Sequence, residues 1–132
     1  MKTTRVAFEG TTDRSYESTV EQCREALAQE GFGVLTEIDV QATLKKKLDV
    51  DVEPHVILGA CHPPSAYRAL TAAPEVGVLL PCNVTVAREG GRTVVRAMNP
   101  ESALTMLENS TVAEVAKEVG AALERVVRSV TG

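Results

Sequence analysis

The side chains best suited to chemistry in this sequence are two cysteines and a histidine that follow two short apolar segments. Cys61 and His62 come after the apolar residues 56–60, and Cys82 comes after residues 76–81. A cysteine thiolate is a nucleophile, a redox group and a metal ligand, and histidine is a common metal ligand. Because both cysteines are expected at strand ends beside prolines, we predict that Cys61, His62 and Cys82 belong to the functional site.

The same residues are compatible with several chemistries. Backbone amides and the dipole at a helix start lower the pKa of a thiol, so Cys61 is a candidate nucleophile or redox thiol. A metal site would use Cys61, His62 and Cys82, with Glu37 as a fourth ligand, although no Cys-x-x-Cys or His-x-x-x-His spacing indicates one. Haem ligation is a variant of this hypothesis. In the alternative interpretation, the cysteines are small buried side chains without a chemical role.

Further candidate residues follow the first cysteine. Tyr67 and Arg68, on a helix predicted after Pro64, would line a groove beside Cys61, although packing and a surface ion pair are their simpler roles. Glu37 is a candidate ligand whose simpler role is a solvated carboxylate. The chain has no Gly-x-Ser-x-Gly motif and no phosphate-binding glycine-rich loop. No catalytic residue, cofactor or substrate follows from the sequence, and binding is favoured over catalysis.

Composition and charge argue against several classes of protein. The net charge is −4 and aromatic residues make up 3% of the chain, whereas nucleic-acid-binding domains carry a basic face and often stacking aromatics. No segment approaches the roughly 20 apolar residues of a membrane span, and the N-terminus does not resemble a signal peptide. Three cysteines, an odd number, fit a reducing cytoplasm better than a set of disulfides. We therefore expect a cytoplasmic protein that binds neither nucleic acid nor membrane.

The spacing of apolar residues predicts one domain, residues 1–132, of alternating strands and helices. Two long amphipathic helices must bury their apolar stripes on a sheet, and a tight hairpin joins the last two strands. The expected fold is α+β, a five-stranded, mainly antiparallel sheet with helices packed on one face. The other face would then form a homodimer interface or a ligand groove. The predicted strands are residues 3–8, 34–40, 54–61, 76–87 and 93–98, and the predicted helices are residues 15–30, 40–48, 63–72, 100–107 and 112–130. Pro81 within the fourth strand implies a bulge, or a backbone nitrogen that points away from the ladder.

Three segments carry a family resemblance: EGFGVLTEIDVQATL at 30–44, ILGACHPPSAYRAL at 57–70 and LLPCNV at 79–84. Together they resemble the domain-of-unknown-function 302 family of small bacterial and archaeal proteins, over residues 5–127. The resemblance implies a fold like that of the TATA-binding protein, formed as a homodimer, but it implies no DNA binding because a shared fold is not a shared site. It also implies no particular activity. Many relatives carry asparagine where this chain has His62.

Two functional hypotheses follow. In the first, the protein is a small cytoplasmic homodimer that binds a ligand or metal, or performs thiol redox chemistry, at a site including Cys61 and Cys82. In the second, it is a structural or protein-interaction module whose cysteines only pack in the core. The distance between the two thiols, and whether they face one open cavity, distinguishes these hypotheses.

Overall fold

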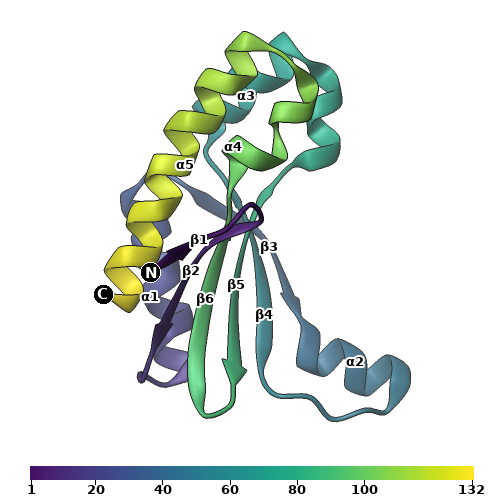
Figure 1. The fold of residues 1–132 in the computed structure, drawn as a ribbon. Coiled ribbons are helices and arrows are strands. Elements are labelled where there is room, and N and C mark those ends of the chain that lie inside the picture. Colours follow the sequence, from purple (N-terminus) through teal and green to yellow (C-terminus); the bar gives the residue numbers. More distant parts are fainter.

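The computed structural model describes residues 1–132, and its central feature is one antiparallel sheet (Figure 1). The six strands have the spatial order β1-β2-β6-β5-β4-β3, and every neighbouring pair is antiparallel. Short turns join β1 to β2 and β5 to β6, whereas the other connections contain helices. The strands are β1 (Lys2–Thr3), β2 (Ala7–Thr12), β3 (Gly33–Asp39), β4 (His55–Cys61), β5 (Cys82–Glu89) and β6 (Arg92–Met98).

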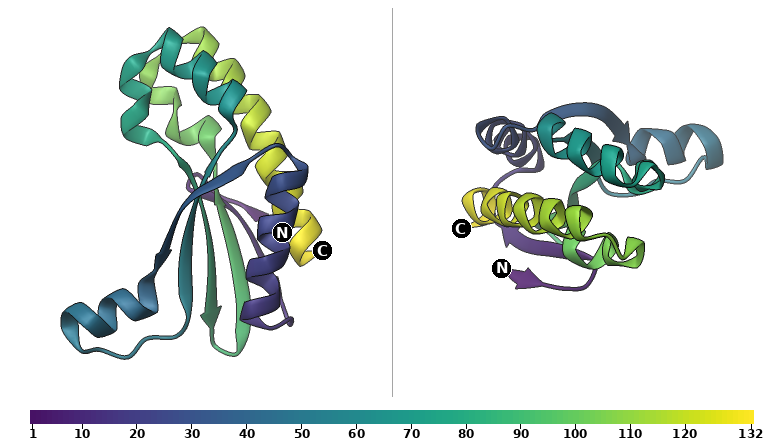
Figure 2. Two further views of the ribbon diagram at one scale, coloured as in Figure 1. Left: turned by 180° about the vertical axis from the view of Figure 1, so that it is seen from behind. Right: turned by 90° about the horizontal axis from the view of Figure 1, so that it is seen from above.

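The helices lie on one face of the sheet and beyond its two ends. Helices α1 and α5 run side by side, with α5 against β2 and β6 and α1 against β3 and β5 (Figure 2). Helix α3 packs against α5 beyond one end of the sheet, and α2 lies at the other end beside β3 and β4 (Figure 1). The helices are α1 (Tyr16–Gln29), α2 (Val40–Leu48), α3 (Pro63–Ala72), α4 (Pro100–Ala103) and α5 (Ser110–Thr131), with 3-10 helices η1 (Pro74–Leu79) and η2 (Thr105–Leu107).

The hydrophobic core fills the space between α1, α5 and the sheet. Val84 and Val86 of β5 are fully buried, whereas their neighbour Asn83 is exposed. Burial at the start of β5 therefore alternates with the two-residue period of a strand. Helix α5 presents a buried stripe from Val112 to Val130 at helical spacing. These two patterns confirm the predicted α+β class, with long helices against one face of an antiparallel sheet.

The prediction of five strands is wrong, because the N-terminal segment forms two strands in place of one. A single strand is predicted at residues 3–8, but the chain turns at Thr4, whose Oγ1 accepts hydrogen bonds from the amides of Val6 (3.1 Å) and Ala7 (2.9 Å). The turn separates β1 from β2, which then continues to Thr12 along β6. Side-chain hydrogen bonds of this kind compete with regular structure and leave no trace in the apolar pattern.

The strand predicted at residues 76–87 is shorter than expected. Residues 74–79 form η1, and β5 begins only at Cys82, after a cis peptide bond between Leu80 and Pro81. Pro81 therefore precedes the strand, and the bulge expected there does not form. A short apolar run is compatible with a buried strand or a buried helix, and Val76 is fully buried within η1. The central position predicted for this strand is confirmed, since β5 lies between β4 and β6.

The sheet face opposite α1 and α5 carries a row of alternating charges formed by Lys2, Glu9, Arg96 and Glu89. Arg96 Nε donates a hydrogen bond to Glu9 Oε1 at 2.7 Å, and its Nη2 donates to Glu89 Oε1 at 3.1 Å. Lys2 Nζ lies 3.4 Å from Glu9 Oε2. The hydrogen bonds from Arg96 are the largest cause of the lowered pKa of both glutamates. The row contains two cations and two anions, so its charges balance.

Candidate functional site

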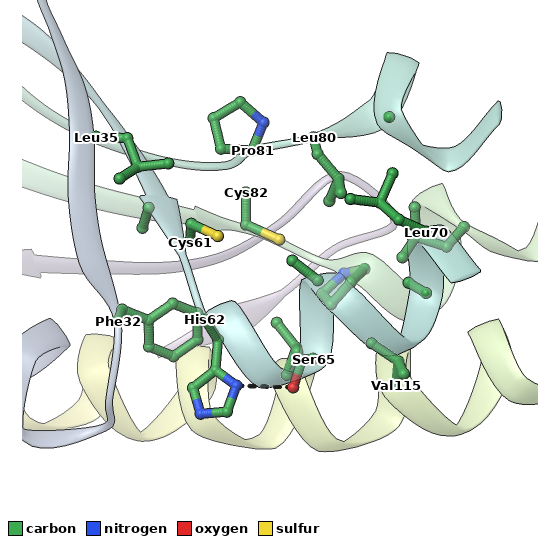
Figure 3. Close-up of a pocket in the computed structure, with 17 residues that line it drawn as sticks. Phe32, Leu35, Cys61, His62, Ser65, Leu70, Leu80, Pro81, Cys82 and Val115 are labelled. Carbon is green, nitrogen blue, oxygen red and sulfur yellow. Dashed lines mark hydrogen bonds between the residues drawn. The ribbon is translucent and has the colours of Figure 1, made fainter. Parts of the chain in front are cut away.

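A cavity of about 320 Å³ lies at the end of the sheet beneath α3 (Figure 3). The ends of β3, β4 and β5 line one side, and α3, η1, α4 and α5 contribute the rest of the wall. Of its 17 lining residues, 12 are hydrophobic, and none has a carboxylate, ammonium or guanidinium group. Small-molecule sites have volumes of roughly 300–1,000 Å³ and mostly apolar walls with few polar groups. The cavity fits this description at the lower end of the size range.

The start of α3 lies close to the end of β4, and short side chains on this helix leave space beside the sheet. Pro63 and Pro64 occupy the first two positions of α3, where a missing amide costs no helical hydrogen bond. Only His62 separates the end of β4 at Cys61 from the start of α3 at Pro63. The residues of α3 that face the cavity include Ala66 and Ala69, whose side chains are too short to fill it.

The two cysteines predicted for the site both line this cavity. Cys61 is the last residue of β4 and Cys82 is the first residue of β5. Both sulfur atoms point into the cavity (Figure 3), and neither is in a disulfide. Cys61 is half-buried, whereas Cys82 is only 6% exposed. Burial, with a smaller contribution from the nearby Cys61, raises the pKa of the Cys82 thiol to about 11. Cys82 is therefore an uncharged thiol at neutral pH.

The start of α3 offers Cys61 less stabilisation than the sequence suggests. A thiolate at a helix N-terminus is stabilised by free backbone amides, but Pro63 and Pro64 have none. The amide of Ala66 is already bonded to the carbonyl oxygen of His62, at 2.9 Å. In the first turn, only the amide of Ser65 is therefore free to stabilise a thiolate. The two prolines thus remove most of the backbone amides that would stabilise a thiolate at this helix start.

His62 forms a small polar edge of the cavity together with Ser65. His62 Nδ1 and Ser65 Oγ share a hydrogen bond of 2.8 Å, drawn in Figure 3. The imidazole ring also packs at a tilt against the ring of Phe32, with centroids 5.4 Å apart. A Cβ atom added to Gly31 would lie 3.2 Å from the same imidazole. His62 is therefore held by contacts on several sides and does not swing freely over the cavity.

Leu35 reaches the rim of the cavity because β3 is irregular at this point. The pairing of β3 with β4 shifts register between Val34 and Thr36, which leaves Leu35 without a partner on β4. Such a bulge re-aims side chains, and bulges are common beside functional sites. Leu35 lines the cavity yet is 67% exposed. Leu70 of α3, 40% exposed, also lines it, so the opening of the cavity is apolar.

Three of the predicted site residues lie elsewhere. Glu37 forms an ion pair with Arg24 of α1, on the face of the sheet that α1 covers. Tyr67 is 74% exposed and does not line the cavity. Arg68 donates a hydrogen bond to Glu118 of α5 at 2.8 Å, which ties α3 to α5 from outside. The structure thus brings Cys61, His62 and Cys82 together and separates them from Glu37, Tyr67 and Arg68.

The donor set required for the metal hypothesis is not assembled. No three His, Cys, Asp or Glu side chains lie close enough together to hold a metal ion. Zinc sites in proteins use three or four such ligands. Glu37, the fourth ligand considered from sequence, is occupied by Arg24. The geometry therefore lends no support to a metal at Cys61, His62 and Cys82.

Several lining residues were not identifiable as site residues from the sequence. Ser65, Leu80 and Phe32 all line the cavity. Ser65 stands three residues after His62, but this spacing matches no capping box, which has serine or threonine at the cap. Phe32 and Leu80 have the appearance of ordinary core residues, because only the folded chain shows that they border an empty space.

Comparison with known proteins assigns this chain to a family. The family described as "Domain of unknown function DUF302" matches residues 8–130. The chain belongs to the DUF302 family. A solved structure described as an uncharacterized conserved protein DUF302 from Bacillus stearothermophilus is similar, with 30% sequence identity and a TM-score of 0.88. The alignment covers 96% of this chain and 98% of that chain. This result confirms the family resemblance seen in the sequence.

Membership of the DUF302 family implies no particular activity. No curated protein matches this chain. None of the helices is long and apolar enough to cross a membrane.

Proposed function

We propose that this DUF302 protein binds a small, uncharged, mainly apolar ligand in the cavity beneath α3. The observation that carries the proposal is the absence of any carboxylate, ammonium or guanidinium group among the 17 lining residues of a cavity of about 320 Å³. Burial of apolar ligand surface is favourable by about 25 cal/mol per Å². An ionised ligand would lose its hydration without gaining a counter-charge. The chemistry of the lining therefore selects for neutral ligands.

The cavity lining has few polar groups. Some of them are already hydrogen-bonded to each other, and the others are only weakly polar. His62 and Ser65 share a hydrogen bond, and the two cysteines present weakly polar, polarisable sulfur atoms. A ligand with one hydroxyl or carbonyl group would meet the His62–Ser65 edge, and its apolar body would lie against the sulfurs and the leucines of the rim. This interpretation replaces the metal alternative with a neutral organic ligand.

A pair of related fluorescent probes tests the proposal. N-phenyl-1-naphthylamine is uncharged, and 8-anilino-1-naphthalenesulfonate has the same ring system with a sulfonate added. We expect the uncharged probe to bind one site per chain and the sulfonate to bind at least tenfold more weakly. Ala66→Phe places a ring in the cavity and should abolish binding of the uncharged probe. Ala42→Phe, on the exposed surface of α2, is the matched control.

Two outcomes would contradict the proposal. Equal binding of both probes would mean that charge is tolerated and that the cavity is not the site. Equal affinity of the Ala66→Phe and Ala42→Phe variants for the uncharged probe would place binding elsewhere. Circular dichroism and thermal unfolding of both variants show whether a loss of binding reflects a loss of fold.

We also propose that a second copy of the chain covers the sheet face opposite α1 and α5. Ile57 and Thr85 are paired on β4 and β5 and are only half-buried, and Ile38 beside Ile57 is 48% exposed. The neighbouring row of charges, from Lys2 to Glu89, contains equal numbers of cations and anions. Covering this row therefore leaves no buried charge without a partner. A homodimer would therefore bury apolar surface here and leave every charge of the row with its partner.

The dimer proposal is tested by light scattering of the purified protein. Wild type should have the mass of two chains, and Ile57→Asp should have the mass of one chain because it places a carboxylate in the interface. Val78→Asp, at a position 87% exposed on η1, should remain dimeric. A monomeric wild type at micromolar concentration would rule the dimer out.

The proposal also includes a fold like that of the TATA-binding protein and a location in the cytoplasm. A single antiparallel sheet with long helices on one face is compatible with the TATA-binding-protein-like arrangement that the resemblance implies. The cysteines at 23, 61 and 82 are all free, which suits a reducing cytoplasm. If the cavity binds no probe, the alternative function is that of a structural or protein-interaction module whose cysteines only pack in the core.

A further inference from the structure

We propose that Cys61 and Cys82 form a reversible disulfide that lowers the affinity of the cavity for its ligand. The inference rests on the proposed function and assigns a redox control to the same site. It starts from the observation that two free thiols from neighbouring strands point into one cavity (Figure 3).

The backbone positions of the two cysteines suit a disulfide. Ala60 and Cys82 are direct partners across β4 and β5, and Cys61 is one residue further along. Directly paired Cα atoms are about 5 Å apart and a strand rises about 3.4 Å per residue, so the Cα atoms of Cys61 and Cys82 are about 6 Å apart. Disulfides join Cα atoms separated by roughly 4.4–6.8 Å. The strand register therefore places the two cysteines within the range that a disulfide spans.

The side chains have the required direction because Cys61 is the last residue of its strand. Along a regular strand, a residue and the neighbour of its partner point to opposite faces of the sheet. At Cys61 the chain leaves the sheet for α3, and its thiol instead lines the cavity that Cys82 also lines. The contribution of Cys61 to the raised pKa of Cys82 is a consequence of the same proximity.

The three thiols of the chain differ in accessibility. Cys23 is fully buried on α1 and does not line the cavity. Cys82 is 6% exposed, and Cys61 is the half-buried one. An oxidant that enters through the opening of the cavity therefore reaches Cys61 first, with Cys82 as the nearest thiol to resolve the product.

The oxidant is a hydroperoxide, and the reaction has two steps. In the first, the Cys61 sulfur attacks the peroxide: the O–O bond breaks, an S–O bond forms, and Cys61 becomes a sulfenic acid as water is released from hydrogen peroxide. In the second, the Cys82 sulfur attacks the Cys61 sulfur: the S–O bond breaks, the S–S bond forms, and the leaving hydroxide takes the Cys82 proton to give a second water. Two thiols lose two electrons, and one peroxide gains them. An added dithiol reverses the result by exchange.

The disulfide changes the cavity in two ways. The two sulfurs, which now face the space that a ligand would occupy, must turn toward one another to bond. Cys61 is also joined directly to His62, the cap of α3, so fixing Cys61 to β5 constrains the start of the helix that forms the wall. Ligand and disulfide therefore compete, and a bound ligand should slow the oxidation.

The test uses the full-length protein and N-phenyl-1-naphthylamine as the probe. After treatment with hydrogen peroxide, we expect the intact mass to fall by two hydrogen atoms and peptide mapping to show a Cys61–Cys82 link. The oxidised protein should bind the probe at least tenfold more weakly, and dithiothreitol should restore binding. Cys23→Ala should behave like wild type, whereas Cys61→Ser and Cys82→Ser should form no internal link. Saturation with the probe should slow formation of the link in wild type.

The outcomes separate this inference from the proposed function. If the reduced protein binds the probe but peroxide gives only sulfinic acid at Cys61 or links between chains, the inference fails and the cavity proposal stands. If the link forms but affinity is unchanged, the control over binding is refuted. If the reduced protein does not bind the probe, the proposed function itself fails, and the redox control fails with it.

Discussion

The Nδ1 atom of His62 and the Oγ atom of Ser65 lie 2.8 Å apart across the first turn of α3. Ser65 is 6% exposed, so this hydrogen bond satisfies a buried hydroxyl and fixes the imidazole beside the cavity. The bond joins two side chains and caps no backbone amide, since the first turn of α3 has no side-chain cap hydrogen bond. The pair thus links the side chain of the cap residue to the first turn of α3 and supplies the polar edge of the cavity.

Removing the hydroxyl tests both roles of this pair. Ser65→Ala should lower the free energy of unfolding by about 1 kcal/mol, because it deletes one buried hydrogen bond and leaves an imidazole nitrogen unpaired. It should also weaken binding of the uncharged probe by a few-fold, since His62 is then less fixed. Urea denaturation and probe titration measure the two effects. Ser102→Ala, at a serine whose side chain makes no hydrogen bond, is the control and should alter neither quantity.

Gly59 is required because the Thr36 side chain and the Pro81 ring occupy the space beside its Cα atom. A Cβ atom at this position would collide with Thr36 Oγ1 on β3 and would lie 2.9 Å from Cγ of Pro81. Gly59→Ala should therefore destabilise the protein by about 1–3 kcal/mol, the usual range for overpacking. Combination with Thr36→Ala should recover part of the loss. Gly33→Ala, where an added Cβ meets nothing within 4 Å, should be nearly neutral, and an equal loss at both glycines would contradict the steric explanation.

The sequence predicts most of the fold where a periodic apolar pattern meets a clear end signal. The stripe from Val112 to Val130 and the Ser15 cap of α1, which accepts a hydrogen bond from the amide of Ser18, are examples. Predictions fail where local polar contacts or a proline decide the backbone. The Thr4 turn splits the first strand, and Pro81 delays the start of β5. Neither the turn at Thr4 nor the late start of β5 can be recognised from the pattern of apolar residues in the sequence.

The candidate site could be predicted only in part. Cys61 and Cys82 were found from residue type and from their position at strand ends, and the structure places both at one cavity. The empty space itself could not be predicted, because it depends on how far Ala66 and other short side chains of α3 stand from the sheet. The bulge that aims Leu35 at the rim is likewise a pairing irregularity of β3 with β4. Spacing along one strand does not reveal such an irregularity.

Leu35 should control access to the cavity without contributing to stability. Because it is 67% exposed, Leu35→Asp should change the free energy of unfolding by less than about 0.5 kcal/mol. The carboxylate should weaken binding of the uncharged probe by roughly three- to tenfold, since binding would bury part of its hydration shell. Leu35→Met should retain binding. Val6→Asp, at an exposed position on the β1–β2 turn, should have no effect, and equal losses in the two aspartate variants would contradict a local role.

Stability should fall in alkali because two thiols are held in their neutral form by burial. Burial raises the pKa of Cys23 to about 12 and, with the help of Cys61, that of Cys82 to about 11. A cysteine in the unfolded chain titrates near about 8.5. As pH rises from about 8.5 toward these values, the unfolded state binds fewer protons than the folded state, so the free energy of unfolding decreases. Each buried thiol contributes a slope of up to about 1.4 kcal/mol per pH unit in this range and none below it.

The Cys23→Ala variant isolates this contribution, because all other titrating groups are common to both proteins. Cys23 has no exposed surface, so the variant should be less stable than wild type at neutral pH through the loss of packing. Its stability should then decrease less steeply with pH, and the difference between the two proteins should shrink between about pH 9 and pH 11. Urea denaturation at a series of alkaline pH values, with a reductant present, measures both curves. Parallel curves would show that Cys23 ionises equally easily in the folded and unfolded states, and the assignment of a buried, neutral thiol would be wrong.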